Sequence, residues 1–106
     1  MSEQAKYRVI VSERAAQLLV RHAAFLAKVN REAADRLVES FAETANSLEE
    51  MPLRGAWFSA NYIPRNVYRY QVFEKRYLML YQVRENTVYV EYVLDCRQDY
   101  RWLLHS

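Results

Sequence analysis

Residues 67–94, VYRYQVFEKRYLMLYQVRENTVYVEYVL, contain the pattern that decides the fold. In the first part, VYRYQVF, aromatic and polar side chains alternate, so that Tyr70 and Arg69 point to opposite faces of a strand. The next two runs, YLMLYQV and TVYVEYVL, are apolar on nearly both faces, which is typical of central strands. The polar stretches FEKRY and VRENTV lie where hairpin turns are needed. This region therefore predicts three consecutive antiparallel strands.

The sequence before this region predicts one short strand and two helices. YRVIVS, residues 7–12, alternates as a strand, and Ser12 stands where a helix N-cap belongs. Asn30 is the expected N-cap of the second helix. The apolar stripes are Ala15, Leu18, Leu19, Ala23 and Leu26 in the first helix and Ala34, Leu37, Val38, Phe41, Ala45 and Leu48 in the second. The short connection favours an antiparallel helical hairpin, which Pro52 and Gly55 bring to an end.

Together these elements predict an α+β fold in the order β-α-α-β-β-β, followed by a short C-terminal helix. In this fold an antiparallel sheet packs on the helical hairpin with one of its faces. At 106 residues the chain has the size of one hydrophobic core. We therefore expect residues 1–106 to form a single domain.

The composition is that of an ordinary globular protein, with 52% hydrophobic and 26% charged residues. No run approaches the roughly 18 consecutive apolar residues of a membrane span. The start of the chain, MSEQAKYRVIV, lacks the apolar core and cleavage site of a signal peptide. Cys96 is the single cysteine and has no partner for an internal disulfide, which fits a reducing compartment. We therefore expect a cytoplasmic protein that does not bind a membrane.

The net charge of +2 is unevenly distributed along the sequence. The first 53 residues carry seven basic and eight acidic side chains. Between Arg54 and Arg84, by contrast, Glu74 is the only acidic residue. It is set against six basic ones, which are Arg54, Arg65, Arg69, Lys75, Arg76 and Arg84. This basic half would attract a phosphate backbone or an acidic protein, although a solvated arginine-rich surface explains it equally well.

The end of the chain, YVLDCRQDYRWLL in residues 92–104, adds polar side chains directly after the last predicted strand. Asp95 with Gln98 three positions later resembles a capping box, which would make Asp95 the N-cap of the final helix. Tyr100 falls on an apolar face of that helix, so packing explains it as well as a chemical role does.

Element order, length and three segments make the chain similar to a known family. The segments are VYRYQVF, RYLMLYQV and the closing VLDCRQDYRWLL. From about Tyr7 to Leu104 the chain resembles the RelE/ParE superfamily of toxins from bacterial type II toxin–antitoxin systems. The resemblance implies a small cytoplasmic toxin that a cognate antitoxin neutralises in a hetero-oligomer. It also implies one of two activities, which are cleavage of messenger RNA on the ribosome and inhibition of DNA gyrase.

The match to RelE-like nucleases is partial. The resemblance places two alternating basic side chains on the strand after the helices, where this sequence has Arg69 and Gln71. The next strand lacks the expected arginine, and Arg76 stands displaced from its position. Arg97 and Tyr100 match the C-terminal arginine and tyrosine positions best. Half of the basic constellation is therefore present.

RNA cleavage by the neighbouring 2′-hydroxyl needs a base, positive charge at the phosphorane and an acid for the departing 5′-oxygen. In a nuclease hypothesis Arg69 and Arg97 bind the phosphorane, because a guanidinium grips two phosphate oxygens and keeps its proton. Tyr100 or His105 then acts as acid or base, and no metal or other cofactor is needed. We expect Arg97 and Tyr100 to lie beside Arg69 on the exposed concave side of the sheet. The residues expected to bind nucleic acid are Arg65, Arg69, Gln71, Lys75, Arg76 and Arg97.

Three functions remain open from the sequence. The first is a ribosome-dependent endoribonuclease, with the ribosome and mRNA as partners. The second is a gyrase inhibitor without nuclease activity, favoured by the missing basic residues, and the third is a degenerate member that only binds its antitoxin. Trp57, Phe58 and Tyr62, in the connection between helix and sheet, are either loop anchors or a surface for the antitoxin.

Overall fold

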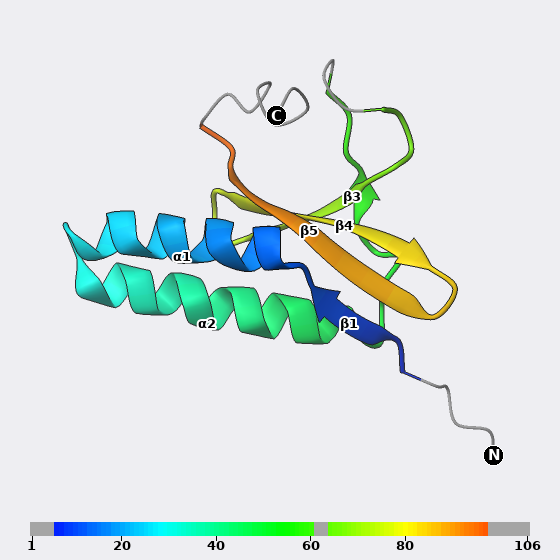
Figure 1. Ribbon diagram of the computed structural model, residues 1–106, viewed down its shortest axis with the longest axis horizontal. Helices are drawn as coiled ribbons and strands as arrows, with labels where there is room; N and C mark the ends of the chain where they lie inside the picture. Colours follow the sequence, from blue (N-terminus) through cyan, green and yellow to red (C-terminus); the bar gives the residue numbers. More distant parts are fainter. Residues whose placement is uncertain (1–5, 61–63, 98–106) are drawn as a thin grey trace.

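The computed structural model describes residues 6–60 and 64–97 (Figure 1). The elements are β1 (Arg8–Val11), α1 (Glu13–Ala27), α2 (Arg31–Ser47), β2 (Ala56–Trp57), β3 (Arg69–Phe73), β4 (Tyr77–Arg84) and β5 (Thr87–Asp95). The predicted α+β fold, with a helical hairpin followed by consecutive strands, is confirmed.

Both helices begin at the predicted caps. The Ser12 hydroxyl accepts a hydrogen bond from the Ala15 amide at 3.0 Å, and the Asn30 side chain accepts one from the Ala33 amide at 3.1 Å. The two helices run side by side and pack on the sheet (Figure 1). The rings of Phe41 in α2 and Phe73 in β3 meet edge to face, with centroids 5.6 Å apart. The helical hairpin thus covers one face of the sheet, as the sequence predicts.

The sheet has the strand order β1-β5-β4-β3-β2 and is mostly antiparallel. β3, β4 and β5 pair through the two predicted hairpins. β1 differs, because it runs parallel to β5. The helical hairpin separates β1 from the other strands in sequence, so no tight turn forces it into antiparallel pairing. β2 was not predicted, since a strand of two residues is too short to show an alternation of apolar and polar side chains.

The core lies where β4 and β5 meet the helices. Met79, Leu80, Val88, Val90 and Val93 are fully buried, which explains why these strands are apolar on both faces. Each such side chain contributes about 1.5–3 kcal/mol on burial. In the helical stripes Leu37 and Leu48 are fully buried, whereas Val38 stays 45% exposed at the margin of its stripe. The central strand pair is therefore the rigid frame that positions the residues at its two ends.

Several predictions concern residues outside the described part of the chain. The C-terminal helix, with Gln98, Tyr100 and His105, is one of them, and Tyr62 is another. Within the described residues, neither α1 nor α2 combines the length and apolar character that a membrane crossing requires.

Candidate functional site

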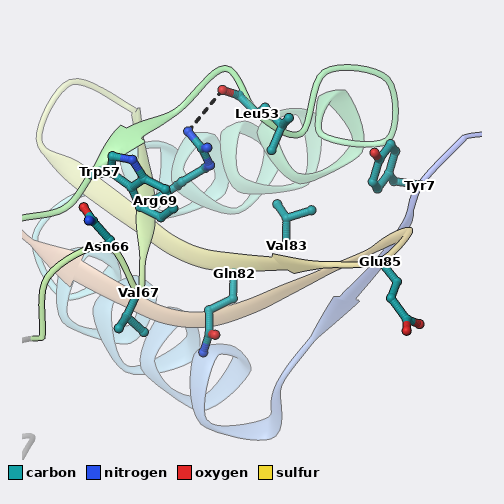
Figure 2. A pocket seen from close by; sticks show the side chains of 9 residues that line it. All are labelled: Tyr7, Leu53, Trp57, Asn66, Val67, Arg69, Gln82, Val83 and Glu85. Atoms are coloured by element: carbon teal, nitrogen blue, oxygen red, sulfur yellow. Dashed lines mark hydrogen bonds between the residues drawn. The ribbon is translucent and has the colours of Figure 1, made fainter.

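Arg69 is the first residue of β3 and holds the segment that leads into the sheet. Its Nη1 donates hydrogen bonds to the carbonyl oxygens of Gly55 at 2.8 Å and Leu53 at 3.3 Å. Its guanidinium lies over the Trp57 ring, with Cζ 4.2 Å from the ring centroid. Figure 2 shows Trp57 and Arg69 stacked together at one end of a cavity, with Leu53 above it. Arg69 thus fixes residues 53–57 and presents Trp57, which is 46% exposed.

Tyr81, in the middle of β4, holds the same segment from inside. Its hydroxyl donates to the Pro52 carbonyl oxygen at 2.9 Å and accepts from the Gly55 amide at 3.1 Å. Burial raises the pKa of the Tyr81 phenol, so it stays a neutral donor. A Cβ atom at Gly55 would lie 2.5 Å from both the Tyr70 carbonyl oxygen and the Tyr81 hydroxyl. The only glycine of the chain therefore serves this close approach.

A cavity of about 430 Å³ opens beside Arg69, along the outer edge of β4 (Figure 2). We call it the β4-edge groove. Its lining consists of Tyr7, Leu53, Trp57, Asn66, Val67, Arg69, Gln82, Val83 and Glu85. It therefore combines apolar side chains with one guanidinium and three further polar side chains.

Gln71, the second residue of the expected basic pair, is also engaged in a structural contact. Its Oε1 accepts a hydrogen bond from Arg54 Nε at 3.1 Å. The same guanidinium donates through Nη2 to the Ser47 hydroxyl at 2.6 Å. Gln71 thus helps to tie the end of α2 to β3.

Arg97 lies beyond the end of β5 and is paired with Asp95. Its Nε and Nη2 donate to the two carboxylate oxygens at 3.2 and 3.0 Å, and its backbone amide donates to Asp95 Oδ1 at 3.0 Å. Burial acts to raise the pKa of Asp95, but the hydrogen bonds and charge of Arg97 outweigh it and hold the pKa below its ordinary value. The hydrogen bonds and charge of Asp95 raise the pKa of Arg97. Asp95 thus accepts a hydrogen bond from the Arg97 amide, as an N-cap does, and also forms a fork-like ion pair with the Arg97 side chain. The helix that Asp95 is expected to cap lies outside the described residues.

A second cavity, of about 520 Å³, lies at this end of the sheet, and we call it the Arg97 cavity. Its lining consists of Arg21, His22, Phe25, Tyr77, Asp95 and Arg97. His22 donates through Nε2 to the Val93 carbonyl oxygen, 3.0 Å away, and meets the Tyr77 ring edge to face. His22 is therefore held by packing and by one backbone contact. Among the described residues no three His, Cys, Asp or Glu side chains gather as metal ligands would.

The structure does not bring Arg69 and Arg97 together, which corrects our expectation of one shared patch. Arg69 pairs with Tyr81 across β3 and β4, whereas Asp95, next to Arg97, pairs with Tyr77. These two tyrosines are four residues apart on β4, which corresponds to about 13 Å along the strand. The two guanidinium groups accordingly line different cavities. Tyr100 and His105 lie outside the described residues, so their roles remain predictions.

The other expected nucleic-acid ligands are exposed. Arg65 lies before β3, and Lys75 and Arg76 form the turn between β3 and β4. The Arg76 carbonyl oxygen accepts a hydrogen bond from the Cys96 amide at 2.9 Å, which brings this turn next to Arg97. Arg76, Arg97 and Arg21 thus form a cationic margin at the Arg97 end of the sheet, distant from Arg69.

The comparisons with known proteins identify the family. The family described as "ParE toxin of type II toxin-antitoxin system, parDE" matches residues 9–100. The chain belongs to this family. ParE toxins are one half of a toxin–antitoxin pair, so family membership implies a cognate antitoxin as partner.

A solved structure has the same fold as this ParE family member. It is that of the chromosomal ParDE toxin–antitoxin system from P. aeruginosa, with a TM-score of 0.70 and 15% sequence identity. The match covers 85% of this chain and 96% of that chain. A comparison with curated proteins gave no match.

Sequence reasoning missed the residues that organise the β4-edge groove of this ParE toxin. The sequence indicates only that Tyr81 is one more aromatic residue of a central strand. Its two backbone contacts come from residues 26 and 29 positions earlier in the chain. Gly55 gave the one usable signal, since a lone glycine after a helix indicates a special backbone position. Of the two roles left open for Trp57, its stacking on Arg69 supports that of a loop anchor.

Proposed function

We propose that this toxin arrests growth by binding DNA gyrase, without cleaving RNA. Membership in the ParE family supports this target, since gyrase inhibition is the activity that the resemblance implies for ParE-like members. The observation that carries the proposal is the separation of Arg69 from Arg97. The nuclease hypothesis drawn from the sequence places both of these positive charges at one phosphorane.

Neither guanidinium is arranged as a phosphate clamp. Arg69 already donates to two backbone carbonyl oxygens and stacks on Trp57, so it acts as part of the framework. Arg97 faces a carboxylate 3.0 Å away, which compensates its charge. A phosphate would have to displace Asp95 before it could use Arg97 in a bidentate contact.

A ribosome-dependent endoribonuclease is the second candidate, and one observation favours it. Arg21, Arg76 and Arg97 gather near one end of the sheet, where an RNA backbone would find positive charge. In this hypothesis the acid and the base come from Tyr100 or His105, and Arg69 has no direct part.

One experiment separates the two candidates. The toxin is purified away from its antitoxin and added both to gyrase with relaxed plasmid and ATP and to ribosomes that translate a defined mRNA. We expect loss of supercoiling or gyrase-dependent DNA breaks, with no new mRNA ends. Toxin that has been mixed with its antitoxin serves as the control and leaves both reactions unchanged. New mRNA ends with unimpaired supercoiling would refute the proposal.

A further inference from the structure

Three aromatic side chains line the Arg97 cavity, and we call them its aromatic wall. They are His22, Phe25 and Tyr77. His22 is held between the Val93 carbonyl oxygen, 3.0 Å away, and the Tyr77 ring, whose centroid lies 5.4 Å from that of the imidazole. Tyr77 is buried, whereas Phe25 is 67% exposed. The aromatic wall is therefore already fixed in part, and it offers an open ring that a partner can bury at little ordering cost.

Positive charge lies beside this wall. The Arg76 guanidinium lies over the wall, 5.9 Å from the centroid of its buried tyrosine ring, and Arg21 lines the cavity from α1. The one carboxylate of the lining is paired with Arg97 at 3.0 Å. Glu74, in the same turn as Arg76, lies 3.7 Å from Arg36 of α2. Within the described ranges no ion pair engages Arg21 or Arg76, so their charges are available to a partner.

This combination suits an acidic protein segment better than a phosphate backbone. Aromatic and arginine side chains are the residues that contribute most to protein–protein interfaces. A phosphate backbone would leave the ring of Phe25 in water and would compete with Asp95 for Arg97. A protein segment that carries an apolar side chain between carboxylates would use both the aromatic wall and the two available charges.

We propose that the Arg97 cavity is the surface with which this toxin binds gyrase. An apolar side chain of an acidic gyrase segment packs against the exposed ring of Phe25, and neighbouring carboxylates meet Arg21 and Arg76. Arg97 stays paired with Asp95 and contributes to the shape of the cavity. This inference rests on the proposed function, because it names the surface through which gyrase is bound.

Two variants with matched controls test the assignment. Phe25→Ser removes the exposed ring, and Arg21→Glu reverses one of the available charges. Val20→Ser, at a residue of α1 that is 65% exposed and does not line the cavity, is the control for the first change. Arg31→Glu, at the exposed first residue of α2, is the control for the second. Urea denaturation of each variant checks that the fold is kept.

Binding of labelled full-length toxin to purified gyrase is measured by fluorescence anisotropy in the absence of DNA. We expect Phe25→Ser and Arg21→Glu each to raise Kd about tenfold or more, and each control to change it by less than about twofold. Added salt should weaken binding of the wild type more than that of Arg21→Glu, since one charge contact is already lost in the variant.

The possible failures are distinguishable. Absence of gyrase binding by the wild-type toxin would overturn the proposed function and this inference together. Binding of both variants with the wild-type Kd would overturn this inference alone. A loss with Arg21→Glu but none with Phe25→Ser would also overturn it, because a contact made through charge alone is what a nucleic-acid backbone would make.

Discussion

The two ends of the sheet use the same residue type in different ways. At the start of β3, Arg69 is half-buried and contacts two carbonyl oxygens and an aromatic ring. Beyond the end of β5, the Arg97 side chain is 60% exposed and bonds to one carboxylate. Arg69 therefore fixes the backbone around it, whereas Arg97 is a surface residue that pairs with one carboxylate. Arginines that match a family's catalytic positions in sequence can thus have unrelated roles in space.

The difference predicts that changes at the Arg69 end affect stability far more than changes at the Arg97 end. The largest effect is expected for Gly55→Ala, because the new methyl group would collide with the Tyr70 carbonyl oxygen and the Tyr81 hydroxyl. We expect a loss of about 3 kcal/mol in the free energy of unfolding, measured by urea denaturation. An unchanged denaturation midpoint would show that residues 52–57 are not fixed as described.

A smaller loss is expected for Tyr81→Phe. This change leaves the Pro52 carbonyl and the Gly55 amide without their side-chain partner, and both residues are buried. The expected cost is about 2 kcal/mol in the free energy of unfolding. Tyr89→Phe, on the half-exposed part of β5, is the matched control and should change stability by less than about 0.5 kcal/mol. Equal effects of the two changes would contradict the anchoring role of Tyr81.

Arg69→Lys is a more conservative test of whether Arg69 fixes residues 53–57. Lysine keeps the charge but cannot lie flat on Trp57 while it donates to both carbonyl oxygens. We expect a loss of about 1 kcal/mol in thermal or urea unfolding, together with a change in Trp57 fluorescence. Arg97→Lys should leave both readouts within error, because that side chain lies at an exposed position. A larger effect at Arg97 than at Arg69 would reverse the comparison.

The smallest effect concerns the pH dependence at the Arg97 end. The pKa of Asp95 lies below its ordinary value in the folded protein, so its carboxylate contributes stability above about pH 4. This contribution is lost as the pH falls through the lowered pKa, because protonation breaks the pair with Arg97. The difference in unfolding free energy between the wild type and Asp95→Asn should therefore be present at pH 7 and shrink below pH 4. A difference that grows on acidification would contradict the sign of the shift.

The fold could be predicted from the sequence because its signals are local. Ser12 and Asn30 are side chains that cap the helix following each of them, and the hairpin turns lie between runs of clear periodicity. The parallel pairing of β1 and the existence of β2 were not predictable in this way, since both depend on contacts between residues far apart in the chain.

The candidate site was harder to predict for the same reason. The sequence identified Arg69 and Arg97 but not the distance between them, which depends on the register along β4. The sequence also gave no sign of the ion pair between Asp95 and Arg97. An aspartate two positions before an arginine can equally serve as the N-cap of a helix. The positions of backbone carbonyl oxygens, which determine the role of Arg69, are not encoded in residue types at all.

The most direct test of the account is to induce the toxin in cells and map both mRNA ends and DNA breaks across the genome. The account predicts breaks at gyrase sites and mRNA ends that match those of uninduced cells. New mRNA ends at codon boundaries without DNA breaks would contradict it, and would return Arg97 to the centre of a nuclease site.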